Sequence, residues 1–124
     1  MSETILVVDD NEDTLKIVGK ILAVERYQVK TAKDGQEALR SIDNETPALI
    51  LLDIMIPKID GFEVCRTIRG NPLMDHIPIL IISARIDDAA QQKASTLGAN
   101  GYLVKPIIPA DILQKVKDHL TPIH

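Results

Sequence analysis

Polar side chains of complementary chemistry stand where short apolar runs end. They are Asp9 and Asp10 after Ile5–Val8, Asp53 after Ala48–Leu52, Ser83 after Ile79–Ile82, and Lys105 after Tyr102–Val104. A polar residue can end any apolar run for solubility alone. Three carboxylates, a hydroxyl and an ammonium group, however, are together the functional groups that a phosphoryl-transfer site requires.

The three aspartates predict a site for a hard cation. Carboxylates gathered in one place repel one another unless a cation neutralises them, and Lys105 supplies one positive charge only. Oxygen ligands without histidine or cysteine select a cation such as Mg²⁺, which is usual where carboxylates meet phosphate and water. The alternative is that Asp9 and Asp10 only begin a loop and, with Asn11, cap the helix that follows.

Asp53 directly follows an apolar run, and a carboxylate held by a rigid strand can attack phosphorus to form an acyl phosphate. Ser83 can donate a hydrogen bond to a phosphoryl oxygen, and Lys105 can offset the charge of that group. Taken singly, Ser83 also fits a hydroxyl bonded to the backbone at a strand end, and Lys105 fits a solvated surface lysine. Their occurrence together with the acids favours phosphoryl transfer.

Strands must position these side chains. The four apolar runs are short and unbroken, which predicts strands that are buried on both faces of a sheet. In a fifth run, Tyr27, Val29 and Thr31 alternate with polar residues. This alternation predicts a strand with one covered face, at a sheet edge.

In the segments between these runs, apolar residues recur at helical spacing. Apolar stripes predict helices around Leu15–Leu22, Ala38–Ile42, Phe62–Arg69 and Ile112–Leu120, the last with Pro109 in its first turn. The segment Asp87–Leu97 has only a thin stripe of alanines. It predicts a loosely anchored surface helix, capped by Asp87 and ended by Gly98.

Five repeats of a strand followed by a helix predict an α/β domain with a parallel sheet and helices on both faces. Five strands are too few for an eight-stranded barrel, so the sheet is expected to be open and doubly wound. Ligands of such sheets bind beyond the carboxyl ends of the strands. With 124 residues, we expect one domain over residues 1–124.

Composition excludes several classes of function. The net charge is −4 and the basic residues are not clustered, which argues against a nucleic-acid partner. Aromatic residues make up 2% of the chain, too few for platforms that stack bases. No apolar run approaches the ~18 residues of a membrane span, and no signal peptide precedes the first strand. A single cysteine, Cys65, excludes an internal disulfide, so we expect a cytoplasmic protein without a membrane partner.

At these residues the chain resembles the receiver domains of two-component response regulators, including the single-domain chemotaxis type. The resemblance covers almost the whole chain, and its motifs stand in the family's order and spacing. They are Asp9-Asp10, Asp53–Gly61, Ser83-Ala84 and Gly101–Pro106. The resemblance implies a flavodoxin-like fold with strand order 2-1-3-4-5 and five helices.

The resemblance also implies a reaction. Asp53 would accept a phosphoryl group from a phosphohistidine on a sensor histidine kinase or a histidine phosphotransfer protein. Mg²⁺ would be held by Asp10, Asp53 and the backbone carbonyl of Met55, with Asp9 acting directly or through water. Ser83 and Tyr102 match the hydroxyl and aromatic positions of the family's switch, in which the hydroxyl moves to the phosphoryl group and the ring turns inward.

Details around the motifs follow from the same resemblance. Lys105-Pro106 matches the family's cis peptide bond, and Gly61 is expected to allow a positive φ in the loop after Asp53. Met55 and Arg85 occupy positions that modulate the lifetime of the phosphoryl group in the family.

We therefore expect a phosphorylation-dependent signalling module that turns over no external metabolite and signals to a downstream effector protein, as a monomer or a phosphorylation-dependent dimer. One alternative is an adaptor that never takes phosphate. The other is an aspartate-dependent phosphatase, which needs a second acid where Met55 stands. The chain is expected to be either a stand-alone regulator or a receiver cut from a larger protein.

Overall fold

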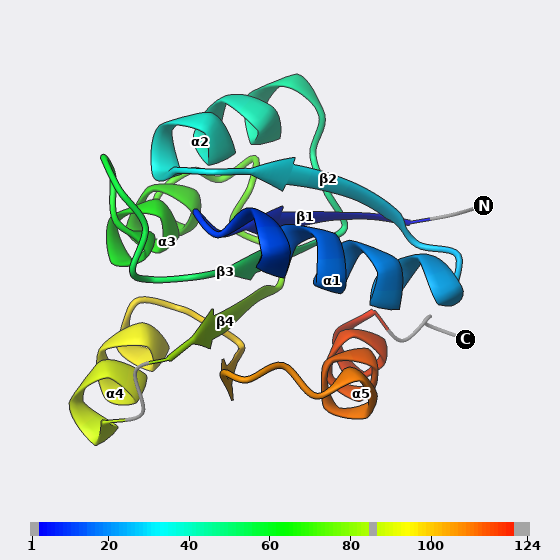
Figure 1. Ribbon diagram of the computed structural model, residues 1–124. Helices are drawn as coiled ribbons and strands as arrows, with labels where there is room; N and C mark the ends of the chain where they lie inside the picture. The colour runs from blue at the N-terminus through cyan, green and yellow to red at the C-terminus, as the bar shows by residue number, and fades with distance from the viewer. Residues whose placement is uncertain (1–2, 85–86, 121–124) are drawn as a thin grey trace.

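Strands and helices alternate along the chain, as the sequence predicts (Figure 1). The computed structural model describes residues 3–84 and 87–120. The strands are β1 (Thr4–Val8), β2 (Gln28–Ala32), β3 (Leu49–Leu52), β4 (Ile79–Ser83) and β5 (Gly101–Val104). The helices are α1 (Glu12–Val24), α2 (Gly35–Asn44), α3 (Gly61–Arg69), α4 (Asp88–Thr96) and α5 (Pro109–His119). Within the described residues, no helix is long and apolar enough to cross a membrane.

These strands form one parallel sheet in the order β2-β1-β3-β4-β5, which confirms the predicted fold class. β2 lies at one edge, as its alternating pattern predicts. β5 lies at the other edge, and its residues are half-buried or exposed. The prediction that Tyr102–Val104 is buried on both faces was therefore wrong, because a strand with one neighbour keeps an open side.

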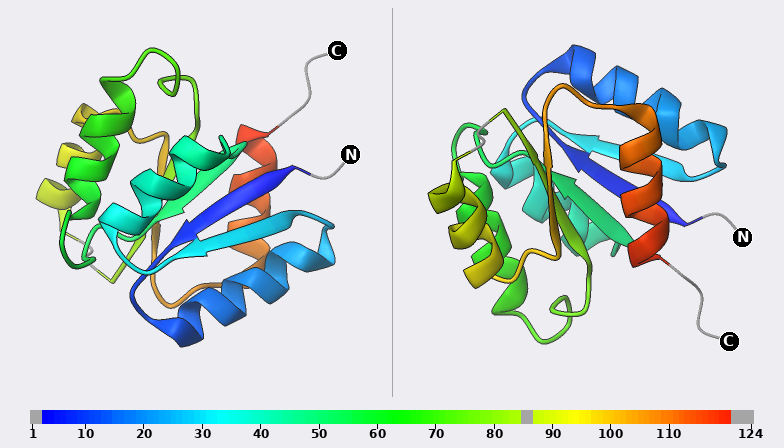
Figure 2. Two further views of the ribbon diagram at one scale, coloured as in Figure 1. Left: turned by 90° about the horizontal axis from the view of Figure 1, so that it is seen from above. Right: turned by 90° about the horizontal axis from the view of Figure 1, so that it is seen from below.

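Helices α1 and α5 cover one face of the sheet, and α2, α3 and α4 cover the other (Figure 2). Strand residues alternate between two apolar layers, since successive side chains of a strand point to opposite faces. The α1/α5 core contains, from the strands, Ile5, Val7, Leu49, Leu51, Leu80 and Ile82. The α2/α3/α4 core contains Leu6, Val8, Ile50, Leu52, Ile79 and Ile81. Burial on both faces explains why these runs are apolar without interruption.

Polar side chains begin most of the helices. Backbone N–H groups three residues on donate to the side chains of Asn11, Asp34, Asp60 and Asp87 over 2.6–3.1 Å. Helix α5 instead begins with Pro109, as predicted. The cap at Asp87 and the positive φ of Gly98, 99°, confirm the predicted limits of α4. Its buried residues are alanines, which confirms its thin contact with the sheet.

Gly61 serves close packing and does not have a positive φ, so the expectation for this residue was wrong. It is the first residue of α3, and the positive φ in this loop, 67°, belongs to Lys58. A Cβ atom on Gly61 would lie 2.4 Å from the Cα atom of Ile54 and 2.7 Å from the carbonyl oxygen of Asp53. Helix α3 therefore starts directly against the backbone that carries Asp53.

Gly61→Ala is expected to lower the free energy of unfolding, because the added methyl group forces the backbone at Ile54 to move. Overpacking of this kind costs about 1–3 kcal/mol. Gly19→Ala in α1 is the matched control, since its Cβ would meet the Cγ1 atom of Val29 at an ordinary 3.9 Å. The control should stabilise by about 0.5–1 kcal/mol through helix propensity. Urea unfolding measures both, and equal stabilisation by the two variants would contradict the packing at Gly61.

Candidate functional site

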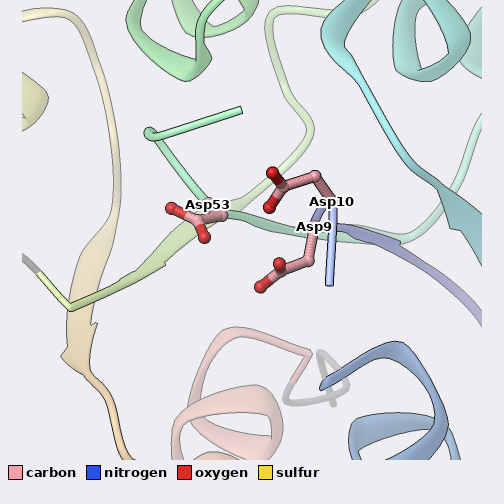
Figure 3. A group of neighbouring side chains, drawn as sticks. All are labelled: Asp9, Asp10 and Asp53. Atoms are coloured by element: carbon pink, nitrogen blue, oxygen red, sulfur yellow. The ribbon is translucent and has the colours of Figure 1, made fainter. Parts of the chain in front are cut away.

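The carboxyl ends of β1 and β3 bring together three aspartates from two distant parts of the sequence (Figure 3). The strands are neighbours in register, with Val8 beside Leu52, so the residues that follow them meet at the same edge. One carboxylate oxygen from each of Asp9, Asp10 and Asp53 lies within 4.8 Å of the others. The sequence prediction that these acids converge is confirmed.

Asp9 and Asp53 are buried and held in the same way. Asp9 is fully buried, and its Oδ1 atom accepts a hydrogen bond of 2.9 Å from the N–H of Asn11. Asp53 is 4% exposed, and its Oδ1 atom accepts one of 2.9 Å from the N–H of Met55. Each carboxylate is thus oriented by a backbone donor two residues further on. Helix α1 is capped by Asn11, not by either aspartate.

Lys105 joins the two buried carboxylates. It follows the edge strand β5, and its Nζ atom lies 2.7 Å from Oδ2 of Asp9 and 2.9 Å from Oδ2 of Asp53. Partial burial alone would lower the pKa of Lys105, but the hydrogen bonds that its ammonium group donates to Asp9 and Asp53 outweigh burial and raise the pKa above its usual value. The lysine therefore stays charged in this site and is not a free surface lysine.

Asp10 completes an acidic cluster that one lysine does not neutralise. Its side chain is exposed and, within the described residues, has no hydrogen-bond or ion-pair partner. Three carboxylates and one ammonium group leave two formal negative charges at the edge of the sheet. A divalent cation with oxygen ligands fits this donor set in both charge and chemistry.

Ser83 and Tyr102 belong to the neighbouring strands β4 and β5. Ser83 is fully buried at the end of β4, and its carbonyl oxygen accepts a hydrogen bond of 2.8 Å from the N–H of Lys105. Tyr102 is paired in register with Ile81 and packs against the α2/α3/α4 core. Because alternate residues of a strand share a face, Ser83 points to the same side of β4 as Ile81.

The loop after Asp53 is fixed by contacts that sequence reasoning missed. Lys58 adopts a positive φ and pairs with Asp34 at the start of α2, with 3.5 Å between Nζ and Oδ2. A Cβ atom on Gly35 would lie 1.9 Å from the carbonyl oxygen of Ile59, so only glycine allows α2 to approach this loop. The sequence holds no signal for this contact, because the partners are far apart along the chain.

The structure also places the cysteine, the peptide bond before Pro106 and the side chain of Met55. Cys65 is buried in α3, and burial raises the pKa of its thiol, as expected of a structural cysteine and not of a nucleophile. The peptide bond between Lys105 and Pro106 is cis, as the resemblance implies. The side chain of Met55 is 59% exposed, next to the acidic cluster. Arg85 lies outside the described residues.

The sheet order, the two helical layers and an acidic cluster at the carboxyl edge define a flavodoxin-like α/β protein of the receiver type. The chain belongs to the response regulator receiver domain family, whose family model matches residues 5–117. The resemblance drawn from the sequence is confirmed. Receiver domains are parts of two-component systems and interact with histidine kinases or phosphotransfer proteins.

Relatives of known name agree with this assignment. The chain is 41% identical to the alkaline phosphatase synthesis transcriptional regulatory protein PhoP of Bacillus subtilis and 38% identical to the response regulator PleD of Caulobacter vibrioides. Both alignments cover 94% of this chain, but 48% of PhoP and 26% of PleD. The chain thus spans half or less of the length of these relatives.

Solved structures of similar size match almost completely. The chemotaxis protein CheY4 of Vibrio cholerae superposes with a TM-score of 0.91 and 30% identity, covering 97% of this chain and 100% of CheY4. The BeF3-activated N-terminal receiver domain of RstA from Klebsiella pneumoniae gives a TM-score of 0.89 and 29% identity, covering 96% of this chain and 99% of that domain.

Proposed function

We propose that this protein is a phosphorylation-dependent receiver that accepts a phosphoryl group on Asp53 from a phosphohistidine of a sensor histidine kinase or phosphotransfer protein. One observation carries the proposal. The buried carboxylate of Asp53 directly follows β3, shares the ammonium group of Lys105 with Asp9, and lies beside the exposed Asp10. This arrangement places a fixed nucleophile among groups that can neutralise a phosphoryl group.

The chemistry is a transfer between two nucleophiles. A carboxylate oxygen of Asp53 attacks phosphorus, an oxygen–phosphorus bond forms, and the nitrogen–phosphorus bond of the phosphohistidine breaks, leaving the electron pair on the imidazole nitrogen. The hydrogen bond from Met55 and the contact with Lys105 hold the carboxylate in place. Lys105 then offsets part of the added negative charge, which the phosphoryl group brings to this edge of the sheet.

Mg²⁺ is the cofactor that suits this cluster. The carboxylates of Asp9, Asp10 and Asp53, together with the backbone carbonyl of Met55, would hold the ion. When bound, the ion neutralises negative charge on the transferred phosphoryl group. The role of Asp9, directly or through water, and the role of the Met55 carbonyl as a ligand stay predictions.

Mg²⁺ is therefore expected to stabilise the folded protein, by about 2.7 kcal/mol at a concentration of 100 times the dissociation constant. Asp10→Asn should weaken this effect, because Asp10 has no other partner among the described residues. Asp13→Asn, an exposed acid in the first turn of α1, is the matched control and should keep it. Thermal unfolding across a Mg²⁺ titration measures all three proteins. Equal responses of wild type and Asp10→Asn would contradict the metal site.

The output of this receiver is a change in a protein-binding face. Ser83 ends β4 beside Lys105, and Tyr102 lies on the same face of the sheet as the neighbouring Ile81. We propose that the hydroxyl of Ser83 moves to the phosphoryl group and that the ring of Tyr102 follows inward. The face altered by this movement would bind a downstream effector, with the protein acting in the cytoplasm as a monomer or as a phosphorylation-dependent dimer.

The test of this function is uptake of phosphate from a small acyl phosphate. With acetyl phosphate and Mg²⁺, intact mass spectrometry should show one added phosphoryl group, and chelation of Mg²⁺ should suppress both uptake and loss. A wild type that stays unmodified would favour an adaptor that never takes phosphate. Release of phosphate from several phosphomonoesters over many turnovers would instead identify a phosphatase. It would contradict the expectation that the protein turns over no external substrate.

A further inference from the structure

An open groove runs along β2, which forms the edge of the sheet opposite to β5. It has a volume of about 540 Å³ and lies between α1 and β2. Figure 2 shows β2 at the edge of the sheet with α1 beside it. Gly19 and Ala23 face the groove from α1, and the space stays open because neither residue carries a large side chain. Leu15 and Val29 give it an apolar lining.

The edge of β2 beside the groove also offers backbone groups that pair with no other strand of the described chain. Gln28 donates its N–H to Glu3, and Ala32 accepts from the N–H of Asp9, so these residues of β2 bond toward β1. The backbone groups of a strand alternate in direction with the pleat, so Val29 and Thr31 direct their N–H and C=O groups away from β1. No strand of the described chain lies on that side. The same two residues line the groove with their side chains.

Lysines surround this groove in a protein whose net charge is −4. Lys16 and Lys20 stand one helical turn apart on α1, and Lys33 stands across the groove just after β2. Lys33 lies 4.0 Å from Glu12, the one acid of the lining. Lys16 and Lys20 make no ion pair within residues 3–84 and 87–120. The groove thus combines an apolar interior with an excess of positive charge.

We propose that this groove binds an extended, acidic segment of a partner protein, which adds to β2 as a further strand. The segment's backbone pairs with the outward groups of Val29 and Thr31, as in other cases of strand addition. Its apolar side chains enter the space above Gly19, and its carboxylates contact Lys16 and Lys20. Backbone pairing supplies affinity, and specificity comes from the side chains on the α1 side of the added strand, which include both apolar and acidic residues.

Charge selects this occupant over a second copy of the chain. Pairing of two β2 edges would bring the lysines around both grooves together, and like charges opposed across an interface cost binding energy. An acidic segment instead gains attraction from the same lysines. The lining of the groove includes none of Asp9, Asp10 and Asp53, so the proposal does not depend on phosphorylation of Asp53.

A direct test uses a soluble peptide of about nine residues in which every second residue is threonine and the positions between are valine and glutamate in turn, so that valine and glutamate share the face toward α1. Binding to the ¹⁵N-labelled protein should shift the amide signals of Val29 and Thr31 and slow their hydrogen exchange, because both N–H groups become hydrogen-bonded. The double variant Lys16→Glu/Lys20→Glu should weaken binding about tenfold or more at low salt, and less at high salt. Gly19→Leu should weaken it similarly by filling the groove, since a Cβ atom at this position would meet the Cγ1 atom of Val29 at an ordinary 3.9 Å.

Matched controls separate this site from general charge effects. Lys93→Glu/Lys115→Glu changes the net charge equally on α4 and α5 and should leave peptide binding unchanged. A peptide in which lysine replaces glutamate should not bind. Phosphate uptake from acetyl phosphate should be the same in all these variants, which keeps this test separate from that of the proposed function.

Four results would overturn the proposal. They are failure of the glutamate peptide to bind, binding that both double variants weaken equally, amide shifts that spare Val29 and Thr31, and self-association of the protein that Lys16→Glu/Lys20→Glu abolishes. The last result would identify a second copy as the occupant.

Discussion

Asp53→Asn is expected to abolish the uptake of a phosphoryl group from acetyl phosphate. The substitution keeps the shape of the side chain, and the amide oxygen still accepts a hydrogen bond from Met55. An amide, however, lacks the negative charge that makes the carboxylate a nucleophile. Intact mass spectrometry after incubation with Mg²⁺ should show one added group on wild type and none at this position on the variant.

Two neighbouring acids make the control for this experiment important. Asp9 is fully buried and pairs with Lys105, while Asp10 is exposed, so neither is equivalent to Asp53. Asp13→Asn, further along the same loop and helix, should take up phosphate like wild type. Fragment mass spectra should place the group on the peptide that contains residue 53. A phosphoryl group on Asp9 or Asp10 in wild type would contradict the assignment of the nucleophile.

The fold was predictable because burial acts on whole runs of residues. Ile79–Ile82 supplies both apolar cores at once, and a run that faces two cores shows no polar interruption. β2 showed its edge position by alternation, since the exposed Gln28 and Lys30 alternate with the half-buried Tyr27 and Val29. β5 was misjudged because its three apolar residues look like a central strand, and only the strand order shows that β5 has one neighbour.

The acidic cluster was predictable for a related reason. Parallel strands carry their carboxyl ends to one edge, so the residues after β1, β3 and β5 must meet there whatever their separation in sequence. The 2.7 and 2.9 Å contacts of Lys105 with Asp9 and Asp53 follow from that rule. The rule says nothing about which helices cover each face, so the packing of Ile81 and Tyr102 against the α2/α3/α4 core, with Ser83 on the same side of β4, needed the structure.

The conformation of the loop after Asp53 could not be predicted from the sequence. Glycine is the residue expected at a positive φ, yet here Lys58 adopts it and Gly61 does not. Instead, the absence of a side chain at Gly61 allows α3 to approach the backbone of Ile54 closely. Gly35 allows a similar close approach of α2 to Ile59. Both are tertiary contacts between elements, and a single sequence does not record the distance between two backbones.

Lys105 links the edge strand to the reaction site, so it is suited to report a change of charge. Its N–H is bonded to the carbonyl of Ser83, while its ammonium group bridges Asp9 and Asp53. Under the proposed function, a phosphoryl group on Asp53 would compete for the ammonium group with the existing partners. We expect a movement of Lys105 to affect β4 and β5, because its backbone follows β5 and is bonded to Ser83 of β4.

Lys105→Met is expected to lower the free energy of unfolding by about 3 kcal/mol in the absence of divalent cations, because it leaves buried carboxylates without their cation. Asp9 and Asp53 have no other ion-pair partner within the described residues. Saturating Mg²⁺ should restore much of the loss, since the ion replaces the missing charge, and metal binding should stay largely intact. Urea unfolding with and without Mg²⁺ measures both effects.

The control for this prediction is Lys115→Met on α5, which should change stability little in either condition. Phosphorylated Lys105→Met should also fail to transmit the signal, so that phosphorylation no longer shifts the amide signals of β5 as it does in wild type. Stability equal to that of wild type without Mg²⁺ would contradict the role of Lys105 as counterion. If phosphorylation shifts the β5 amide signals of the variant as much as those of wild type, Lys105 is not part of the switch.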